Sequence, residues 1–203
     1  MHEEYDAGTA LLAVDVQNDF ADPAGGLSVA GAEAILPVLN AEIAAARAAG
    51  AFVAYTQDWH PPSTPHFAKD GGTWPVHCVG GTWGAELHPG LVADAGPSVR
   101  KGTNGEDGYS GFTMRDPLTG ATVPTELDGL LRSRGIRRIV IGGLAMRLGD
   151  TLLAPAREVL AAEALPQSVA ACTIVPAALG ERIGDVAALC VAAAGAREVA
   201  RIK

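Results

Sequence analysis

One carboxylate and three imidazoles stand close together in the sequence, in a pattern that suits a metal ion. Asp58 and His60 come directly after a short apolar run, with one residue between them, and His66 and His77 follow. In an extended chain alternate side chains share a face, so Asp58 and His60 can bind the same ion. Three imidazoles and a carboxylate suit zinc, iron(II) or manganese(II). Solvated loop histidines are the alternative, but four of the chain's five histidines fall between residues 60 and 88, which favours a metal site.

A second pair of chemical groups, Asp15 and Lys101, lies at the carboxyl ends of predicted strands. An acid at the end of a strand can act as a general base, and a nearby ammonium lowers its pKa and stabilises a developing oxyanion. A structural ion pair is the alternative, and the two residue types alone leave both interpretations open.

Three aromatic residues accompany these groups in the sequence. Phe20, Trp74 and Tyr109 could form a slot for a flat ring, because aromatic faces stack on one another. Packing in the hydrophobic core is the alternative interpretation, and it would suffice for Phe20 alone.

The elements that must position these residues alternate between strand and helix. Apolar runs and helical spacing predict strands at 9–16, 52–56, 98–100, 138–142, 168–175 and 198–202, and helices at 35–49, 126–134, 151–164 and 183–194. This alternation requires right-handed crossovers and a parallel sheet that is covered on both faces. We therefore predict an α/β fold, a three-layer αβα sandwich with a central parallel sheet, as a single domain over residues 1–203.

Parallel sheets of this kind bind ligands outside the carboxyl ends of their strands. Asp15, Asp58 and Lys101 are therefore expected on one rim of the sheet. The segment 143–149 follows the predicted strand at 138–142 and belongs to the same rim. Residues 59–96 form a long irregular stretch beside it, and long loops without elements of their own are usually functional or disordered. The tryptophans in this stretch argue for order.

The composition restricts the partners of the chain. A net charge of −8 without a basic cluster argues against nucleic acid and against an anionic membrane. No apolar run reaches the length that spans a membrane. Charged residues make up only 19% of the chain, so we expect part of its surface to be buried in a homo-oligomer. Three widely spaced cysteines do not form a disulfide framework, and we expect a reduced, cytoplasmic setting.

Several longer motifs resemble the nicotinamidase/pyrazinamidase branch of the isochorismatase-like hydrolases. They are VDVQNDF at 14–20, TQDWHP at 56–61, WPVHCVGGTWGAELHP at 74–89, KG at 101–102, YSGF at 109–112 and GGLA at 142–145. The resemblance covers residues 9 to about 145 and weakens sharply afterwards. Motifs of this length do not agree by chance.

The resemblance implies a metal-dependent amide hydrolase that converts nicotinamide to nicotinate and ammonia, with one divalent metal ion and a small aromatic amide as its ligands. By position, Asp15 matches the general base of the family and Lys101 the lysine of its catalytic triad. The matching metal ligands are Asp58, His60, His66 and His77. Phe20 and Trp74 match residues that sandwich the pyridine ring. The bond between Leu144 and Ala145 matches a cis peptide whose N–H faces the carbonyl oxygen of the substrate.

The chain departs from the family where the nucleophilic cysteine is expected. Relatives continue GLA with Thr-Asp-Tyr/His-Cys-Val, whereas this chain continues with Met-Arg-Leu-Gly-Asp at 146–150. Without a gap, Gly149 occupies the position of the nucleophile, and a two-residue deletion would place Arg147 there instead. Neither alignment supplies a thiol, so the covalent route through a thioester is closed.

Three interpretations of this departure stay open. Gly149 could leave room for a water beside Asp15, which would make the protein a cysteine-independent hydrolase. The protein could also be a catalytically inactive relative that binds a small aromatic amide or serves a regulatory role. Finally, residues 146–172 could be an altered stretch in an otherwise ordinary amidase.

Overall fold

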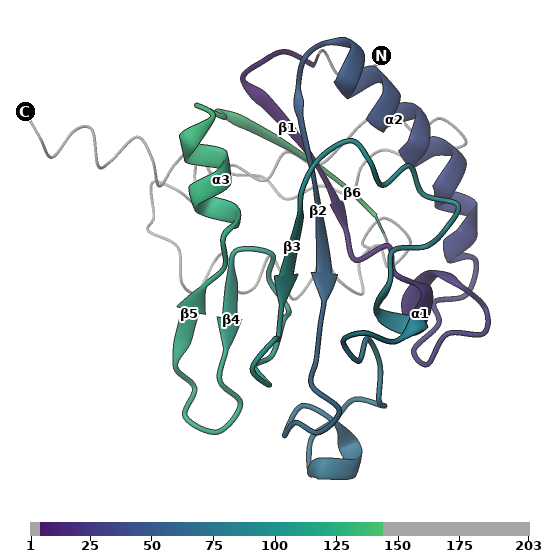
Figure 1. Ribbon diagram of the computed structural model, residues 1–203, viewed down its shortest axis with the longest axis vertical. Helices are drawn as coiled ribbons and strands as arrows, with labels where there is room; N and C mark the ends of the chain where they lie inside the picture. The colour runs from purple at the N-terminus through teal and green to yellow at the C-terminus, as the bar shows by residue number, and fades with distance from the viewer. Residues whose placement is uncertain (1–4, 144–203) are drawn as a thin grey trace, which may run out of the picture.

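The described part of the chain, residues 5–143 of a computed structural model, is built around a parallel sheet (Figure 1). Its strands are β1 (Thr9–Val14), β2 (Phe52–Asp58), β3 (Ser98–Lys101) and β6 (Arg138–Gly143), in the order β3-β2-β1-β6. All three strand pairs are parallel. The elements that we predict beyond residue 143 lie outside the described residues.

Residues of β1 alternate between two hydrophobic layers, as side chains on a strand must. Leu11 and Ala13 are buried with residues of helix α2 (Leu36–Ala48), whereas Ala10 and Leu12 are buried with residues of helix α3 (Leu127–Ser133). The two helices therefore cover opposite faces of the sheet. This arrangement confirms the prediction of an αβα sandwich with a central parallel sheet.

Four strands end at residues other than those predicted, and for β6 the difference is a single residue, since it ends at Gly143 instead of at 142. β1 ends at Val14 rather than at residue 16, because Asp15 has a φ of 54° and turns the chain away from the sheet. β2 continues to Asp58 and β3 to Lys101, since these two residues are paired in register at the end of the two strands. Asp58 and Lys101 thus belong to strands instead of following them.

The remaining elements are short. Helix α1 (Asn18–Ala21) follows β1, and three 3₁₀ turns are formed by Ala32–Ile35, Ala68–Asp70 and Trp83–Ala85. The stretch between β2 and β3 is otherwise irregular, as predicted. An antiparallel hairpin of β4 (Thr113–Arg115) and β5 (Thr122–Pro124) was not expected, and it lies next to β3 in Figure 1.

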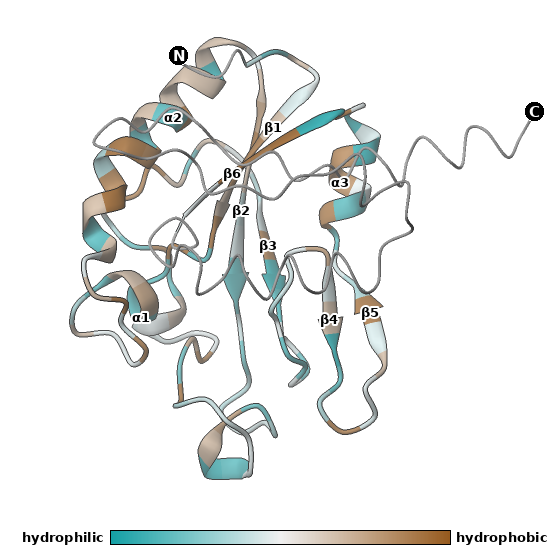
Figure 2. Cartoon of the chain, turned by 180° about the vertical axis from the view of Figure 1, so that it is seen from behind, coloured by the Kyte–Doolittle hydropathy of each residue, from teal (hydrophilic) through white to brown (hydrophobic). Residues whose placement is uncertain are grey.

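None of the helices within residues 5–143 is long and apolar enough to cross a membrane. Figure 2 shows hydrophilic residues at the carboxyl ends of β2 and β3. This is the rim at which the sequence places its reactive groups.

Candidate active site

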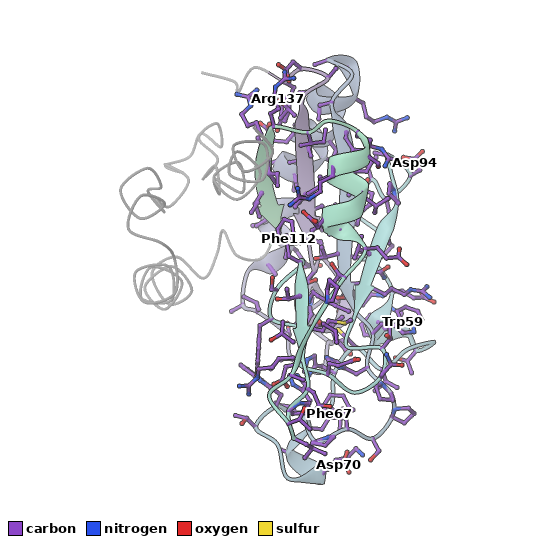
Figure 3. All side chains as sticks on the ribbon, turned by 90° about the vertical axis from the view of Figure 1, so that its left-hand side faces the viewer. Trp59, Phe67, Asp70, Asp94, Phe112 and Arg137 are labelled. Atoms are coloured by element: carbon purple, nitrogen blue, oxygen red, sulfur yellow. The ribbon has the colours of Figure 1, made fainter. Side chains whose placement is uncertain are left out.

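The candidate site lies at the carboxyl end of the sheet. In Figure 3, Arg137, which precedes β6, and Phe67 lie toward opposite ends of the molecule. The Phe67 ring is buried, and its centroid lies 5.5 Å from that of His60 and 5.6 Å from that of His77. The histidines predicted to bind metal are therefore gathered beyond the strand ends.

Lys101 joins the two predicted acids of the rim. Its ammonium nitrogen donates to Asp15 Oδ2 at 2.9 Å and to Asp58 Oδ1 at 2.5 Å. The other oxygen of Asp15 accepts a hydrogen bond of 2.7 Å from the Thr56 hydroxyl. Gly108 closes over this group, because a Cβ there would meet Asp58 Oδ1 at 2.5 Å. The ammonium is held by two carboxylates, and Lys101 as a whole residue is only 1% exposed.

The electrostatics of this group keep the lysine charged. Burial alone would lower the pKa of Lys101, but the charges of Asp15 and Asp58 outweigh that effect and raise it above its usual value. Burial and the charge of Asp58 raise the pKa of Asp15, against the opposing effect of Lys101. Asp15 keeps 21% of its side chain accessible. A carboxylate with a raised pKa and partial access has the properties of a general base.

The backbone at Asp15 is strained in a way that aims its side chain at the rim. A φ of 54° is uncommon outside glycine, although aspartate tolerates it better than most residues. The Asp15 N–H donates to the Thr56 carbonyl at 3.2 Å, and the Gln17 N–H donates to the Asp15 carbonyl at 2.9 Å. Strain of this kind concentrates at functional sites, where surrounding contacts maintain it.

The three imidazoles form one cluster. His60, His66 and His77 are all buried, and each offers a ring nitrogen within 4.8 Å of the other two. The rings of His60 and His66 are stacked with centroids 4.6 Å apart. The structure thus brings together three donors that lie apart along the stretch between β2 and β3.

His60 gives the best test of whether a metal fits. Both of its ring nitrogens are buried, and neither has a hydrogen-bond partner among the residues that the structure describes. Burial and the neighbouring His66 and His77 lower its pKa to about 3, so its imidazole is neutral and carries a free lone pair. A buried polar group without a partner is costly, and a metal ion would satisfy one nitrogen. The donor set therefore fits a divalent cation.

His77 presents its second nitrogen to the same cluster. Its Nδ1 lies 2.7 Å from the Pro75 carbonyl oxygen, to which only a protonated nitrogen can donate. The lone pair then resides on Nε2, which lies 4.0 Å from Asp58 Oδ2. Burial lowers the pKa of His77, which keeps this ring neutral as metal ligation requires.

Asp58 adjoins the cluster through His77. Its carboxylate is not among the three donors that lie within 4.8 Å of one another. Two donor atoms that bind one zinc ion at about 2.0–2.2 Å lie roughly 3–3.5 Å apart in a tetrahedral site. The distance from Asp58 Oδ2 to His77 Nε2 is somewhat longer, at 4.0 Å. The fourth predicted ligand therefore stands next to the imidazoles, and its other oxygen is already occupied by Lys101.

The predicted aromatic residues flank the cluster on different sides. Phe20 lies with its ring centroid 5.4 Å from that of His77, and Trp74 stacks on His66 at 6.4 Å. The Trp74 indole N–H donates to the Tyr109 hydroxyl at 2.8 Å, and Tyr109 is 69% exposed. Trp74 and Tyr109 therefore form a joined, accessible wall beside the imidazoles.

The predicted oxyanion and nucleophile positions lie outside the described residues. These are Leu144, Ala145 and Gly149. Cys78 is the only cysteine within residues 5–143, and its thiol is buried. Burial and the nearby acids raise the pKa of this thiol well above its usual value, which disfavours the thiolate that a nucleophile needs.

A second group of donors, Asp22, Glu33 and His88, does not fit a metal ion. The Gly90 N–H donates to His88 Nδ1 at 3.0 Å, so the proton of the neutral ring is on Nε2. That nitrogen faces Asp22 and Glu33, each at 3.9 Å, and a protonated nitrogen cannot ligate a metal.

Three supporting residues were not identified from the sequence. Gln17 is buried and bonds both backbone groups of Asp58, accepting its N–H at 2.8 Å and donating to its carbonyl at 2.7 Å. Thr56 orients Asp15, and Asp107 contacts His66 at 2.6 Å. Gln17 and Thr56 are polar residues in or beside buried strands, a signal that could have identified them. Asp107 carries no such signal.

Comparison with known proteins places the chain in a family. The sequence matches the profile of the isochorismatase domain over residues 9–149. The chain belongs to the isochorismatase family. It is 38% identical over 156 residues to a nicotinamidase of Acinetobacter baylyi, covering 67% of this chain and 68% of that protein. It is 36% identical over 139 residues to a nicotinamidase/pyrazinamidase of Mycobacterium tuberculosis, covering 67% of this chain and 71% of that protein.

Two solved structures are similar to the chain in both sequence and fold. The PnC1 protein of L. infantum in complex with nicotinate has a TM-score of 0.63 at 38% identity, covering 72% of each chain. The pyrazinamidase of Pyrococcus horikoshii in complex with zinc has a TM-score of 0.57 at 35% identity, covering 68% of this chain and 72% of that one. These matches confirm the resemblance drawn from the motifs.

Replacing His60 by Ala should remove one donor of the imidazole cluster. We expect zinc affinity to fall by more than the roughly 10–100-fold that is typical when only a supporting residue is lost. The measurement is a zinc titration of the metal-free protein against a chelating indicator. His88→Ala is the matched control, because it removes a buried histidine outside the cluster. Equal zinc affinity in the two variants would contradict the assignment.

Proposed function

We propose that the protein is a metal-dependent hydrolase of a small aromatic carboxamide, with nicotinamide as the expected substrate and nicotinate and ammonia as products. The observation that carries the proposal is the Lys101 ammonium between Asp15 and Asp58, directly beside three buried imidazoles. The nicotinamidase relatives and the zinc-bound pyrazinamidase support it.

The metal would be one divalent ion held by His60, His66 and His77, with Asp58 adjoining. Such an ion supplies a Lewis acid that can fix the ring nitrogen of the heterocycle. Its identity is proposed as zinc, with iron(II) and manganese(II) as the other candidates, because imidazole suits all three.

Asp15 is assigned the role of general base. In the proposed reaction it takes a proton from water, and the water oxygen forms a bond to the amide carbon as the carbonyl becomes an oxyanion. The carbon–nitrogen bond then breaks, and the proton on Asp15 passes to the departing ammonia. Lys101 holds Asp15 in place, and its positive charge stabilises the oxyanion.

Water is the proposed nucleophile because no thiol stands at position 149. Relatives use a cysteine, and its loss should reduce the rate by several orders of magnitude relative to a thiolate enzyme. A glycine at position 149 carries no side chain that could act in place of the cysteine, and Asp15 is partly accessible to water. The protein is therefore proposed to be a slow amidohydrolase in comparison with its relatives.

The test is ammonia release from nicotinamide and from pyrazinamide. Protein loaded with zinc, iron(II) or manganese(II) is compared with protein treated with a chelator. Release above the chelated control, restored by adding back one metal, is the expected result. No release with any of the three metals would reject the proposal.

The pH dependence of hydrolysis should reflect the protonation of the Asp15 carboxylate. A general base acts only when deprotonated, and burial raises its pKa above the usual 3.8. For the metal-saturated protein, kcat/KM should therefore rise with pH along an acid limb centred above pH 3.8 and then level off. A pH profile from 4 to 9 tests this expectation. Activity that falls as pH rises from 4 to 7 would be inconsistent with Asp15 as the base.

A second candidate function is binding without turnover. The observation in its favour is the rewritten segment at 146–150, where several family residues change together with the cysteine. Calorimetry with nicotinamide and nicotinate separates the two functions. Tight binding with no ammonia release favours the binding role, whereas turnover excludes it.

A further inference from the structure

Asp107 contacts the imidazole cluster from a part of the chain that neither the motifs nor the comparisons assign to the site. Its Oδ1 lies 2.6 Å from His66 Nδ1. The side chains of His66 and Asp107 are only 4% and 7% exposed. This is a short, dry contact between a carboxylate and an imidazole.

The contact determines which nitrogen of His66 can bind an ion. A carboxylate accepts hydrogen bonds, so Nδ1 must carry the proton. The lone pair of the neutral ring then lies on Nε2. Histidines that ligate metals usually donate their other N–H to a carboxylate or carbonyl, which fixes the ring and makes it a better ligand. His77 is held in the same way by the Pro75 carbonyl.

Asp107 is itself anchored to the β4–β5 hairpin. Its N–H donates to the Arg115 carbonyl at 2.7 Å, and the Arg115 N–H donates to the Asp107 carbonyl at 3.0 Å. The Arg115 guanidinium lies 3.5 Å from Asp107 Oδ2. Both the backbone and the carboxylate of Asp107 are thereby fixed by the end of β4.

The loop that carries His66 is tied to the same region. Thr64 is 2% exposed, and its hydroxyl donates to the Gly105 carbonyl at 2.7 Å. The same hydroxyl accepts the His66 N–H at 3.2 Å. Backbone and side chain of His66 are therefore both positioned by residues 105–107.

We propose that Asp107 is a positioning residue of the metal site, which fixes His66 with Nε2 toward the ion, and that Arg115 of the hairpin holds Asp107 for this task. The inference rests on the metal-dependent function proposed above. It adds a supporting carboxylate and assigns a role to a hairpin that lies outside the central sheet.

The experiment measures zinc affinity and the state of the His66 ring in variants of Asp107. Asp107→Ala should weaken zinc binding by about 10–100-fold, as loss of such a partner typically does. Asp107→Asn should lose less zinc affinity than Asp107→Ala, because its amide oxygen still accepts a hydrogen bond from His66 Nδ1. Arg115→Ala should also lose less zinc affinity than Asp107→Ala. Asp128→Asn, on the exposed surface of α3, is the control and should bind zinc like the wild type.

A second readout separates positioning from general stability. In metal-free protein, ¹⁵N chemical shifts should show His66 with its proton on Nδ1 in the wild type, and a mixture of both tautomers in Asp107→Ala. Thermal unfolding of the same samples shows that each variant is folded at the temperature of the titration. A purely structural role would lower the unfolding temperature and leave zinc affinity and tautomer unchanged, which would overturn the inference.

Failure of the inference is distinguishable from failure of the proposed function. Wild-type protein that binds zinc without releasing ammonia contradicts the hydrolase, while zinc affinity of the Asp107 variants still decides the inference. Unchanged affinity in Asp107→Ala overturns the inference even when the wild type hydrolyses nicotinamide. Wild-type protein that binds no zinc also overturns the inference about Asp107. In that case ammonia release alone shows whether the protein hydrolyses nicotinamide.

Discussion

Replacing Asp15 by Asn is expected to lower kcat for nicotinamide hydrolysis by about 10²–10⁴-fold, the usual contribution of a general base. Asn has the same size as Asp and can keep the contact with the Thr56 hydroxyl, but it cannot take a proton from water. Zinc affinity should stay close to that of the wild type, since Asp15 contacts Lys101 and not the imidazoles. The measurements are single-substrate kinetics by ammonia release and a zinc titration of both proteins.

A matched control separates the base from a general effect of charge. Asp128→Asn makes the same chemical change on the exposed surface of α3, and it should leave kcat unchanged. Asp15→Asn that retains wild-type turnover would show that Asp15 is part of a structural ion pair only. That outcome would remove the central catalytic assignment.

Replacing Lys101 by Met should destabilise the protein strongly. Removal of one partner from a buried ion pair costs about 3–5 kcal/mol, because an uncompensated charge stays buried. Here two carboxylates, Asp15 and Asp58, would lose the ammonium that they share. The measurement is the free energy of unfolding in urea at neutral pH, made on metal-free protein so that ligand binding does not contribute.

Two further variants test the cause of that loss. Lys69→Met removes an exposed lysine that pairs with Asp70, and such surface pairs contribute about 0–1 kcal/mol. The double variant Lys101→Met with Asp15→Asn removes one of the two repelling charges and should recover part of the stability. A loss at Lys101 no larger than the loss at Lys69 would contradict the view that this ion pair is buried and shared.

The sequence alone predicts the sheet and the rim well, for a physical reason. The runs that form β1, β6 and the first half of β2 are largely apolar, which is typical of strands buried in a parallel sheet. Asp15 follows β1, and Asp58 and Lys101 end β2 and β3, so the parallel topology itself brings the three residues together. The histidines follow β2 closely, and their number near one acid indicates that they bind the same metal ion.

Contacts between side chains that lie far apart in the sequence are harder to predict. Asp107 lies 41 residues beyond His66, in a stretch without helical or strand periodicity. Its contact depends on the path of two irregular loops, which local patterns do not specify. The β4–β5 hairpin was overlooked for a different reason, since its strands are only three residues long. The Asp-Pro and Thr-Gly pairs between them are turn signals that could have indicated it.

Metal binding at the imidazole cluster is tested most directly by anomalous diffraction from crystals soaked with zinc and nicotinamide. We predict one zinc ion bound at about 2.0–2.1 Å by nitrogens of His60, His66 and His77, with the Asp58 carboxylate beside it. We also predict that nicotinamide lies between that ion and Asp15. Crystals that show zinc elsewhere, with the three imidazoles free of metal, would contradict the proposed metal site.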